Sequence, residues 1–544
     1  MVTHFKVRLY LLALFLIAGM GLLVYRLYLI QVNEHEYYAK RVPGSRYQTV
    51  RVPGIRGEIK DRNGLTLVDS TPNYELQFNL REIVEDALKG AERKALHHYI
   101  IDGEEVKPHE YTRYDSGGQK QDKSELDVVK LVELTVFPEL QQLGLLADYS
   151  SNAMRVHYRT NRGIVPFTYR RELSFKEFAR FAENNLGIPG VTVTRTGRRR
   201  YFYDSLGCHI LGYMNRANPD QVDAEKKKEF TYYVGDAYGV QGVESTMDSY
   251  LQGNAGSVMI ERNEKGKFVR EVSQTDPQSG GDVFLTLDAR IQLVTEQSLR
   301  AVGRGAAVVV DPRNGDILAM ASVPSFNPNV FIPEVSIEDW KRYSEDPTSP
   351  LFNRAVSPAA PGSTAKIPIA LSGCLSDSWS ERFLCGAGAQ YGRKFMKCHC
   401  AGKGYTHGNP NVSEAIKSSC NGFFYRYAND TGIRNIETVT SLLGMGRTTG
   451  IQITGEKPGN IPNPEWLRQQ GLNWSDAFTA LTSIGQGATE ATPLQMACVT
   501  AWSANGGKVF QPRIIKKVQE ADGSLSLENK PLIKHDFDQR RHHC

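Results

Sequence analysis

A strong excess of either charge is missing from this sequence of 544 residues. It carries 65 Lys and Arg against 60 Asp and Glu, a formal net charge of +5. So small an excess does not imply a nucleic-acid partner, and we expect none. Internal repeats and low-complexity tracts are also absent, which excludes repeat arrays and biased disordered segments. With 40% hydrophobic and 23% charged residues, the chain is an ordinary globular one, long enough for roughly two to four domains.

Charged residues are also absent from the strongly apolar segment 9–25. Together with residues 26–30 it reaches the roughly 20 residues that cross a bilayer. Lys6 and Arg8 precede it, which favours a cytoplasmic N-terminus. No small-residue cleavage site follows, which argues against a secretory signal peptide. We therefore expect a cytoplasmic tail at 1–8, a single-pass anchor at 9–30 and an extracytoplasmic remainder.

Residues 31–280 form the first expected unit after the anchor. Asn63-Gly64 between alternating apolar residues is a strong signal for a β-hairpin. Ser124 and Asp127 have the spacing of a capping box ahead of an apolar run, which predicts a helix from Ser124. The unit is therefore expected to mix strands and short helices.

A second unit is expected over residues 281–544. A strand begins it, and Asp288 then caps a helix over residues 289–302. The continuous apolar run at 306–310 is typical of a central strand, and residues 317–322 return as its hairpin partner. The fold class is therefore α+β, with helices around an antiparallel sheet.

A serine and a lysine stand three residues apart at Ser363 and Lys366, where an apolar helix is expected to begin. Residues i and i+3 share one helix face, so Lys366 can take the proton of the serine hydroxyl if burial or a neighbouring cation lowers its pKa. Pro361-Gly362 favours a turn just before the helix, and at a helix N-terminus backbone N–H groups favour a developing anion. A capping serine beside a solvated lysine is the alternative that this motif alone leaves open.

A second polar pair follows at Ser419 and Asn421. A hydroxyl and a carboxamide two residues apart on a loop can point into one cleft. There the hydroxyl can relay a proton, and the amide can hold a substrate carbonyl. Taken alone, the pair fits an ordinary loop equally well.

Together the two pairs resemble the motifs of penicillin-binding proteins and serine β-lactamases, namely Ser363-x-x-Lys366 and Ser419-x-Asn421. Three further segments and the anchor narrow the resemblance to class B penicillin-binding proteins, most similar to the penicillin-binding protein 2 group of cell elongation. The segments are RGEIKDRNG at 56–64, GVQGVE at 239–244 and SIGQG at 483–487. The resemblance extends over about residues 5–515, nearly the whole chain.

This resemblance implies an elongated pedestal and a serine-transpeptidase (β-lactamase-like) domain outside the bacterial inner membrane, with no organic cofactor. The implied activity is a D,D-transpeptidase that cross-links peptidoglycan and is inhibited by β-lactams. Ser363 would attack the D-Ala-D-Ala carbonyl of a stem peptide, and Lys366 would be the general base. Ser419 would pass the proton to the leaving amine, and Asn421 would hold the donor peptide. Class B members lack a glycosyltransferase domain, so a glycan polymerase and other elongation-complex proteins are implied as partners.

The family's third motif, Lys-Thr-Gly or Lys-Ser-Gly, does not occur after Gln486. In the family its strand lines the cleft, binds the substrate carboxylate and lends an oxyanion N–H, and one such donor is worth roughly 10²–10³ in rate. We expect a reading frame that is truncated or frameshifted before this motif. The alternative function is therefore a non-catalytic relative that acts as a scaffold or β-lactam sensor. A β-lactamase would need a deacylating base that the sequence does not indicate.

Five of the eight cysteines fall within residues 374–420, together with two histidines. Outside the cytoplasm disulfides are the default expectation, but this spacing also suits a tetrahedral zinc. Some members similar to penicillin-binding protein 2 carry a zinc site in this region. Disulfides and unpaired buried thiols remain open alternatives. The expected ligands of a structural zinc are Cys385, Cys398, His407 and Cys420, with Cys400 as the substitute for Cys398.

Overall fold

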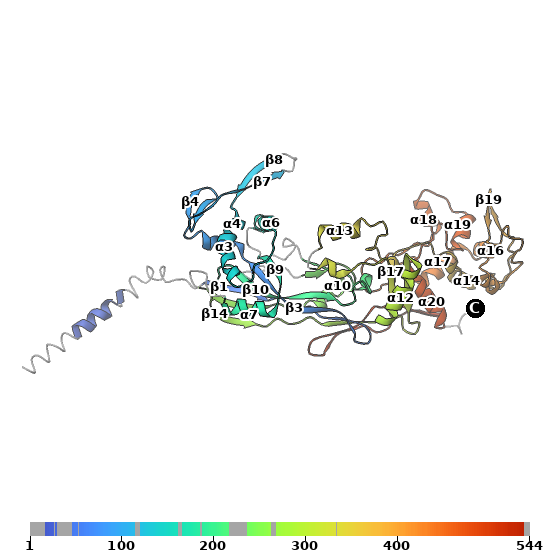
Figure 1. Ribbon diagram of the computed structural model, residues 1–544. Helices are drawn as coiled ribbons and strands as arrows, with labels where there is room; N and C mark the ends of the chain where they lie inside the picture. Colours follow the sequence, from blue (N-terminus) through green and yellow to red (C-terminus); the bar gives the residue numbers. More distant parts are fainter. Residues whose placement is uncertain are drawn as a thin grey trace, which may run out of the picture.

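The computed structural model describes residues 17–26, 28–29, 46–52, 54–114, 120–161, 166–184, 188–216, 237–262, 268–332 and 335–537. The molecule is elongated, with the first half of the chain at one end and the last third at the other (Figure 1). Within the described residues, no helix is both long enough and apolar enough to cross a bilayer. Of the anchor predicted at 9–30, residues 17–26 and 28–29 are described, and the rest lies outside the described residues.

The end formed by the first half of the chain is built on a long antiparallel pair, β3 (Thr66–Phe78) and β10 (Val191–Tyr201). β9 (Phe167–Leu173) pairs with β3. Apolar side chains of these strands and of the neighbouring helices form one continuous core, in which Leu76 and Phe78 are fully buried. The helices are α3 (Leu80–Ala87), α4 (Val128–Thr135), α5 (Phe137–Gln142), α6 (Ser151–Asn161) and α7 (Phe175–Asn184).

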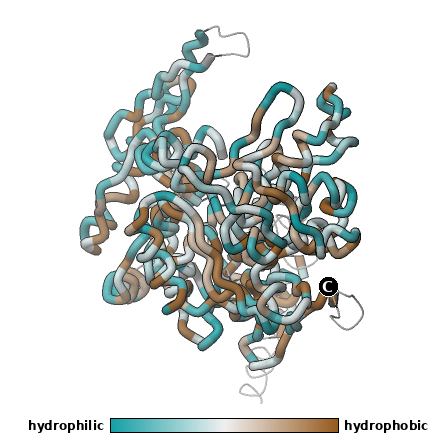
Figure 2. Tube along the Cα trace, turned by 90° about the vertical axis from the view of Figure 1, so that its right-hand side faces the viewer, coloured by the Kyte–Doolittle hydropathy of each residue, from teal (hydrophilic) through white to brown (hydrophobic). Residues whose placement is uncertain are grey.

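The helix predicted from Ser124 begins four residues later. α4 starts at Val128, and its N-cap is Asp127, whose carboxylate accepts backbone N–H groups of the first turn. Ser124 lies instead in β8 (Lys120–Glu125), which pairs with β7 (His109–Tyr114). This hairpin projects from the body and is largely hydrophilic (Figure 2). The capping-box prediction at Ser124 was wrong because strand pairing overrode the local helix signal.

One seven-stranded sheet joins the two ends of the molecule. Its order is β10-β3-β2-β15-β21-β22, with β9 beside β3. β2 (Ile59–Lys60) and β3 form the hairpin predicted from the sequence, and β2 runs parallel to β15 (Asp282–Leu285). β15 then pairs antiparallel with β21 (Ile515–Gln519), which pairs with β22 (Leu525–Glu528). The second unit is thus mounted on the first through backbone hydrogen bonds.

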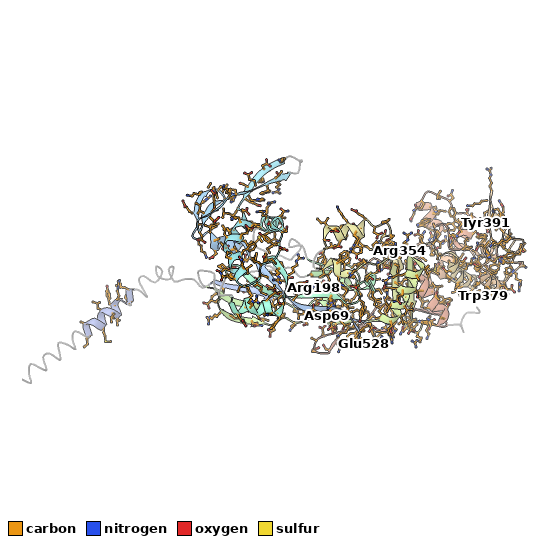
Figure 3. All side chains as sticks on the ribbon, in the orientation of Figure 1. Asp69, Arg198, Arg354, Trp379, Tyr391 and Glu528 are labelled. Carbon is orange, nitrogen blue, oxygen red and sulfur yellow. The ribbon has the colours of Figure 1, made fainter. Side chains whose placement is uncertain are left out.

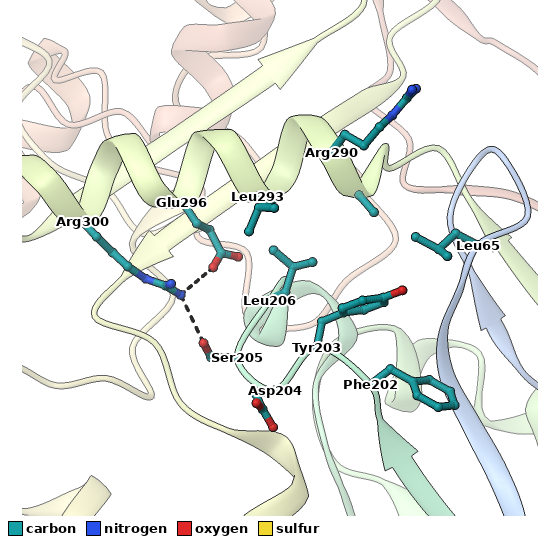
Figure 4. A pocket seen from close by; sticks show the side chains of 11 residues that line it. Leu65, Phe202, Tyr203, Asp204, Ser205, Leu206, Arg290, Leu293, Glu296 and Arg300 are labelled. Carbon is teal, nitrogen blue, oxygen red and sulfur yellow. Dashed lines mark hydrogen bonds and ion pairs between the residues drawn. The ribbon is translucent and has the colours of Figure 1, made fainter.

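A pocket of about 460 Å³ lies at this joint, between the turn after β10 and helix α12 (Ala289–Val302) (Figure 4). Arg300 crosses from α12 and donates to the Glu296 carboxylate at 2.8 Å and to the Ser205 hydroxyl at 3.1 Å. The residues that line the pocket include none of the predicted site residues. They are Leu65, Phe202, Tyr203, Asp204, Ser205, Leu206, Ala289, Arg290, Leu293, Glu296 and Arg300.

The second unit begins as the sequence predicted. Asp288 caps α12, because its side chain accepts the backbone N–H of Arg290. β16 (Gly305–Val310) and β17 (Ile317–Val323) follow as an antiparallel hairpin. Among the described strands, however, β16 pairs only with β17 and is half-buried. The expectation that 306–310 form a central strand was therefore wrong, and β17 is the more buried strand of the pair.

Helices dominate the far end of the molecule, where Trp379 and Tyr391 are labelled in Figure 3. One core cluster contains Ala365, Ile369, Phe423, Phe424 and Tyr427, all buried. The helices that contribute to this cluster are α14 (Lys366–Ser372), α15 (Val412–Lys417), α16 (Asn421–Thr431), α17 (Ile433–Leu442) and α19 (Asp476–Thr482). Two further helices in this part of the chain are α18 (Pro464–Gln469) and α20 (Pro493–Ala504).

Candidate active site

Ser363 stands on the 3-10 turn η5 (Gly362–Ala365), which runs directly into α14. The loop that contains Gly485 is hydrogen-bonded to this turn, because the backbone N–H of Gly362 donates to the carbonyl of Gly485 at 3.0 Å. Both glycines have left-handed backbone conformations, with φ of +59° and +63°. A Cβ on Gly485 would come within 2.3 Å of the Gly362 carbonyl oxygen. Only glycine at 485 lets the loop approach the serine turn this closely.

The second motif lies on the tight link between α15 and α16. Ser419 occupies this link with φ of +50°, a left-handed conformation that is uncommon for residues other than glycine. Cys420 is the N-cap of α16, and its Sγ accepts the backbone N–H of Phe423 at 3.3 Å. The strained turn and the cap together place Ser419 and Asn421 at the N-terminal end of α16.

The side chain of Lys366 connects the two motifs. Its Nζ donates to Asn421 Oδ1 at 2.6 Å, to the Ser419 carbonyl at 2.8 Å and to Ser419 Oγ at 3.1 Å. Ser419 Oγ donates in turn to Ser363 Oγ at 3.1 Å. The four predicted residues therefore form one hydrogen-bonded line, in which Ser419 stands between the lysine and the serine of the first motif. The lysine thus reaches Ser363 through Ser419.

Burial differs sharply along this line. Lys366 is only 2% exposed, whereas Ser363 faces solvent. Burial disfavours the ammonium form and lowers the pKa of Lys366 to about 8, although thiolate charge on Cys398 and Cys420 would raise it. Three acceptors match the three N–H donors of an ammonium group. Because the pKa of Lys366 is lowered to about 8, part of the protein holds a neutral Lys366 amine near neutral pH. This amine can accept a proton that Ser419 passes on.

The predicted metal ligands also meet in space. Single ligand atoms of Cys385, Cys398, His407 and Cys420 all lie within 4.8 Å of one another. His407 Nδ1 is 3.4 Å from Cys385 Sγ and 3.7 Å from Cys398 Sγ. Cys400, the predicted substitute for Cys398, lies beside this group with its Sγ 3.6 Å from that of Cys385. All four cysteines are buried and carry free thiols.

The sulfur cluster is directly connected to the serine site. Cys420 belongs to the cluster and also caps the helix that begins at Asn421. Burial raises the pKa of Cys398, but backbone hydrogen bonds from Cys400, Gly422 and Asn421 outweigh it and lower this pKa to about 7. Whatever holds the four sulfur and nitrogen ligands together therefore also holds the link that carries Ser419.

His209 lies apart from the serine site. Its Nε2 is 2.8 Å from the carbonyl oxygen of Pro350, and its ring meets Phe326 edge-on. Ser363 is hydrogen-bonded to Ser419, which is hydrogen-bonded to Lys366, and this histidine is not part of that line. Sequence reasoning, for its part, gave no individual role to Gly485. Its only signal was its place in the SIGQG segment, and the close approach to Gly362 becomes visible only in three dimensions.

Two family descriptions match adjacent parts of the chain. Residues 51–285 match the penicillin-binding protein dimerisation domain. Residues 305–541 match the penicillin binding protein transpeptidase domain. The first match covers the unit built on β3 and β10, and the second covers the unit that carries Ser363.

Curated relatives extend the similarity over most of the chain. Peptidoglycan D,D-transpeptidase MrdA of Acinetobacter baumannii is 29% identical over 517 residues, which cover 93% of this chain and 68% of the relative. The protein of the same name from Escherichia coli is 29% identical over 516 residues, which cover 92% of this chain and 72% of that one.

Solved structures share the fold. Penicillin-binding protein 2 of Helicobacter pylori, in a complex with MreC, matches with a TM-score of 0.67 at 22% identity, over 92% of this chain and 82% of that one. A chain from a structure described as the coordination of polymerization and crosslinking by a peptidoglycan synthase complex matches with a TM-score of 0.62 at 26% identity. That match covers 97% of this chain and 82% of the other.

Proposed function

This chain belongs to the class B penicillin-binding proteins, and from that membership we propose that it is a peptidoglycan D,D-transpeptidase that works through a serine acyl-enzyme. The observation that carries the proposal is the hydrogen-bonded line from buried Lys366 through Ser419 to exposed Ser363. A nucleophile that faces solvent beside a buried base is the arrangement that acyl transfer to a large external substrate requires. The substrate is a stem peptide that ends in D-Ala-D-Ala.

Acylation follows from this geometry. Ser363 Oγ attacks the carbonyl carbon of the penultimate D-Ala while its proton moves to Ser419 Oγ, and the Ser419 proton moves to the neutral Lys366 amine. The C–N bond of the tetrahedral intermediate then breaks, and the same line returns a proton to the leaving D-Ala amine. Asn421 holds Lys366 through its Oδ1 and can donate its amide N–H groups to the donor peptide. The product is an ester on Ser363.

Transfer reverses the direction of proton flow. The amine of a second stem peptide attacks the ester carbonyl, and its proton passes through Ser419 to Lys366. The C–O bond to Ser363 breaks, and Ser363 Oγ recovers a proton. A β-lactam would follow only the first half of this scheme, because its opened ring remains attached and blocks the approach of the amine.

Benzylpenicillin is the reagent that tests the proposal. We expect full-length protein incubated with it to gain the mass of one benzylpenicilloyl group, located by peptide mapping on the peptide that contains Ser363. The adduct should persist after the free drug is removed. An unmodified protein, or an adduct on another residue, would contradict the proposed activity and leave a scaffold role.

The membrane anchor and the partners belong to the same proposal. Residues 9–30 would hold the protein in the bacterial inner membrane as a single-pass segment, with the described units on the periplasmic side. The relatives named D,D-transpeptidase and the synthase-complex structure support partners in the elongation machinery, foremost a glycan polymerase. The unit that matches the transpeptidase description would cross-link the peptides, and the unit that matches the dimerisation description would mount it. The polymerase would supply the glycan strands.

A structural zinc fits the cluster of Cys385, Cys398, His407 and Cys420. In a tetrahedral site with Zn–S near 2.3 Å and Zn–N near 2.0 Å, ligand atoms are separated by roughly 3.5–3.8 Å. The sulfur–nitrogen distances of 3.4 and 3.7 Å are close to that range. Three thiolates and one imidazole are also a typical structural donor set. When bound, the metal would supply a cross-link that fixes the Ser419 link through Cys420.

Metal analysis checks this part of the proposal. We expect purified full-length protein to contain about one zinc per chain, and a strong chelator to remove it and lower the melting temperature by several degrees. Cys420→Ser should lose zinc although serine can still cap α16. Cys498→Ser is the matched control, since Cys498 is a free thiol outside the cluster. Zinc-free protein in which these thiols are oxidised in pairs would contradict the metal site.

A further inference from the structure

A stretch without acidic residues surrounds the sulfur cluster. Between Glu381 and Glu414 the chain has no Asp or Glu over residues 382–413. Arg382, the first cation of this stretch, pairs with Glu414 at 3.0 Å. The other four cations are exposed and form no ion pair within the described structure; they are Arg393, Lys394, Lys397 and Lys403. We call the surface formed by these four the basic apron.

The apron matters because the chain as a whole is nearly neutral. The formal net charge of +5 is spread over 544 residues, while four uncompensated cations fall within residues 393–403. Unpaired surface charge of one sign raises the local concentration of ligands of the opposite sign. Two half-exposed aromatic rings accompany the cations: Phe395 is 46% exposed and Tyr405 is 50% exposed. The surface thus combines positive charge with apolar contact area.

The hairpin that carries three of these cations is hydrogen-bonded to α16. It consists of β18 (Gly388–Tyr391) and β19 (Lys394–Lys397). The Tyr391 hydroxyl donates to the carbonyl of Tyr425 on α16 at 2.9 Å, and the Tyr425 hydroxyl donates to the carbonyl of Lys397 at 3.2 Å. Tyr391 is labelled in Figure 3 at the far end of the molecule. Two side-chain hydrogen bonds therefore attach the hairpin to the helix that begins at Asn421.

A short series of sequence neighbours and contacts also connects the basic apron to Ser363. Lys397 directly precedes Cys398, whose Sγ lies within 4.8 Å of that of Cys420. Cys420 in turn directly follows Ser419, which contacts Ser363. Ser363 faces solvent, so the second substrate of a transfer reaction can reach it from the surface.

We propose that the basic apron is the docking surface for the acyl acceptor, an anionic peptide whose free amine attacks the Ser363 ester. This rests on the proposed transpeptidase function. An uncleaved acceptor stem keeps its C-terminal carboxylate, and the four cations complement that charge. Phe395 and Tyr405 offer faces for its alkyl side chains. A docked acceptor converts the attack of the amine into an intramolecular-like step.

Binding of a defined peptide tests the surface directly. The probe is a fluorescent tetrapeptide that has a side-chain amine and a C-terminal carboxylate, compared with the same peptide as its C-terminal amide. Full-length Ser363→Ala protein is used, so that no acylation is needed. We expect the acid to bind roughly tenfold more tightly than the amide at low salt, and the difference to vanish near 0.5 M NaCl, where the Debye length is only about 4 Å.

Removal of charges tests whether the cations of the basic apron cause the preference for the acid peptide. The variant Arg393→Gln/Lys394→Gln/Lys397→Gln should lose the preference for the acid. The matched control, Lys341→Gln/Lys508→Gln/Lys530→Gln, removes three exposed lysines elsewhere and should keep it. Equal affinity for acid and amide, or equal losses in both variants, would overturn the proposal. So would binding of a short DNA duplex as tightly as the acid peptide, because the surface would then attract any polyanion.

Turnover separates this inference from the proposed function. In otherwise wild-type protein, the apron variant should be acylated by benzylpenicillin within twofold of the normal rate. With a peptide ending in D-Ala-D-Ala as the acyl donor, transfer to the acid peptide should need roughly tenfold more acceptor for half-maximal rate. If the wild-type protein is not acylated, the proposed function fails, while the binding experiment still decides the docking surface. If acylation and transfer are both unchanged in the variant, only the docking surface fails.

Discussion

Replacement of Lys366 by alanine is expected to slow acylation of Ser363 by benzylpenicillin by roughly 10²–10⁴-fold, the usual contribution of a general base. Lys366 Nζ is hydrogen-bonded to Ser419 Oγ, which is hydrogen-bonded to Ser363 Oγ. No other titratable side chain lies on this line. Loss of the amine therefore leaves the Ser363 proton without an acceptor inside the protein. Time-resolved intact-mass measurements with excess drug give the rate.

The pH dependence of the wild-type rate follows from the same amine. Burial lowers the pKa of Lys366 to about 8, so below that pH most of the protein holds an ammonium that cannot accept a proton. The rate should rise about tenfold per pH unit up to pH 8 and then level off. The Lys366→Ala variant should lack this rise. A wild-type rate that is flat between pH 6 and 9 would contradict the assignment of Lys366 as base.

Arginine at 366 is the informative control. It keeps a cation and hydrogen-bond donors for Ser419 and Asn421, but it stays protonated because its pKa lies above about 12. Lys366→Arg should therefore be as slow as Lys366→Ala if the lysine acts as a base. A rate near that of the wild type would show that the residue acts only through its charge. Ser419→Ala should also be slow, because it removes the hydroxyl between the lysine and Ser363.

Structural features that depend only on neighbouring residues in the chain could be predicted from the sequence. Asp288 was expected to cap a helix over residues 289–302, and α12 has those bounds, because a cap needs only the next turn. Ser363 and Lys366 are likewise adjacent in the chain and lie on one turn of helix. The capping box at Ser124 failed although it is equally local, since that residue pairs across a hairpin with β7.

Long-range features of the site were not accessible in this way. Ser419 and Asn421 were joined to Ser363 only through the family resemblance, because no spacing rule connects motifs 56 residues apart. The left-handed backbone of Ser419, its place between base and nucleophile, and the contact of Gly485 with Gly362 depend on how three separate segments pack. Tertiary packing of this kind leaves no periodic trace in the sequence.

A buried ion cluster lies inside the first unit, and the second large effect is expected there. Glu244 is fully buried, and its carboxylate accepts from Arg56 Nε at 2.8 Å, from Arg199 Nε at 2.8 Å and from the Tyr201 hydroxyl at 3.1 Å. Arg56 also pairs with Asp248 at 2.7 Å. Burial alone would raise the pKa of Glu244, but the two arginines outweigh it and lower this pKa. Glu244 is therefore ionised in the folded protein at neutral pH.

Glu244→Gln should destabilise the protein by about 3–5 kcal/mol at pH 7, because it leaves the buried Arg199 guanidinium without a counter-charge and removes one of the two carboxylates beside Arg56. The midpoint of urea unfolding measures this loss. Glu172→Gln is the matched control, since Glu172 is 62% exposed and pairs with Arg198 at the surface; it should cost less than about 1 kcal/mol.

The stability that Glu244 contributes depends on pH. Because the folded pKa of Glu244 lies below the unfolded value, the stabilisation is fully present above the unfolded pKa, about 4.3–4.5, and is lost as pH falls through the folded pKa. The advantage of the wild type over Glu244→Gln should therefore be constant from pH 7 to pH 5 and shrink below that. If the two proteins unfold at the same urea concentration at pH 7, the carboxylate is not what holds Arg56 and Arg199 in the interior.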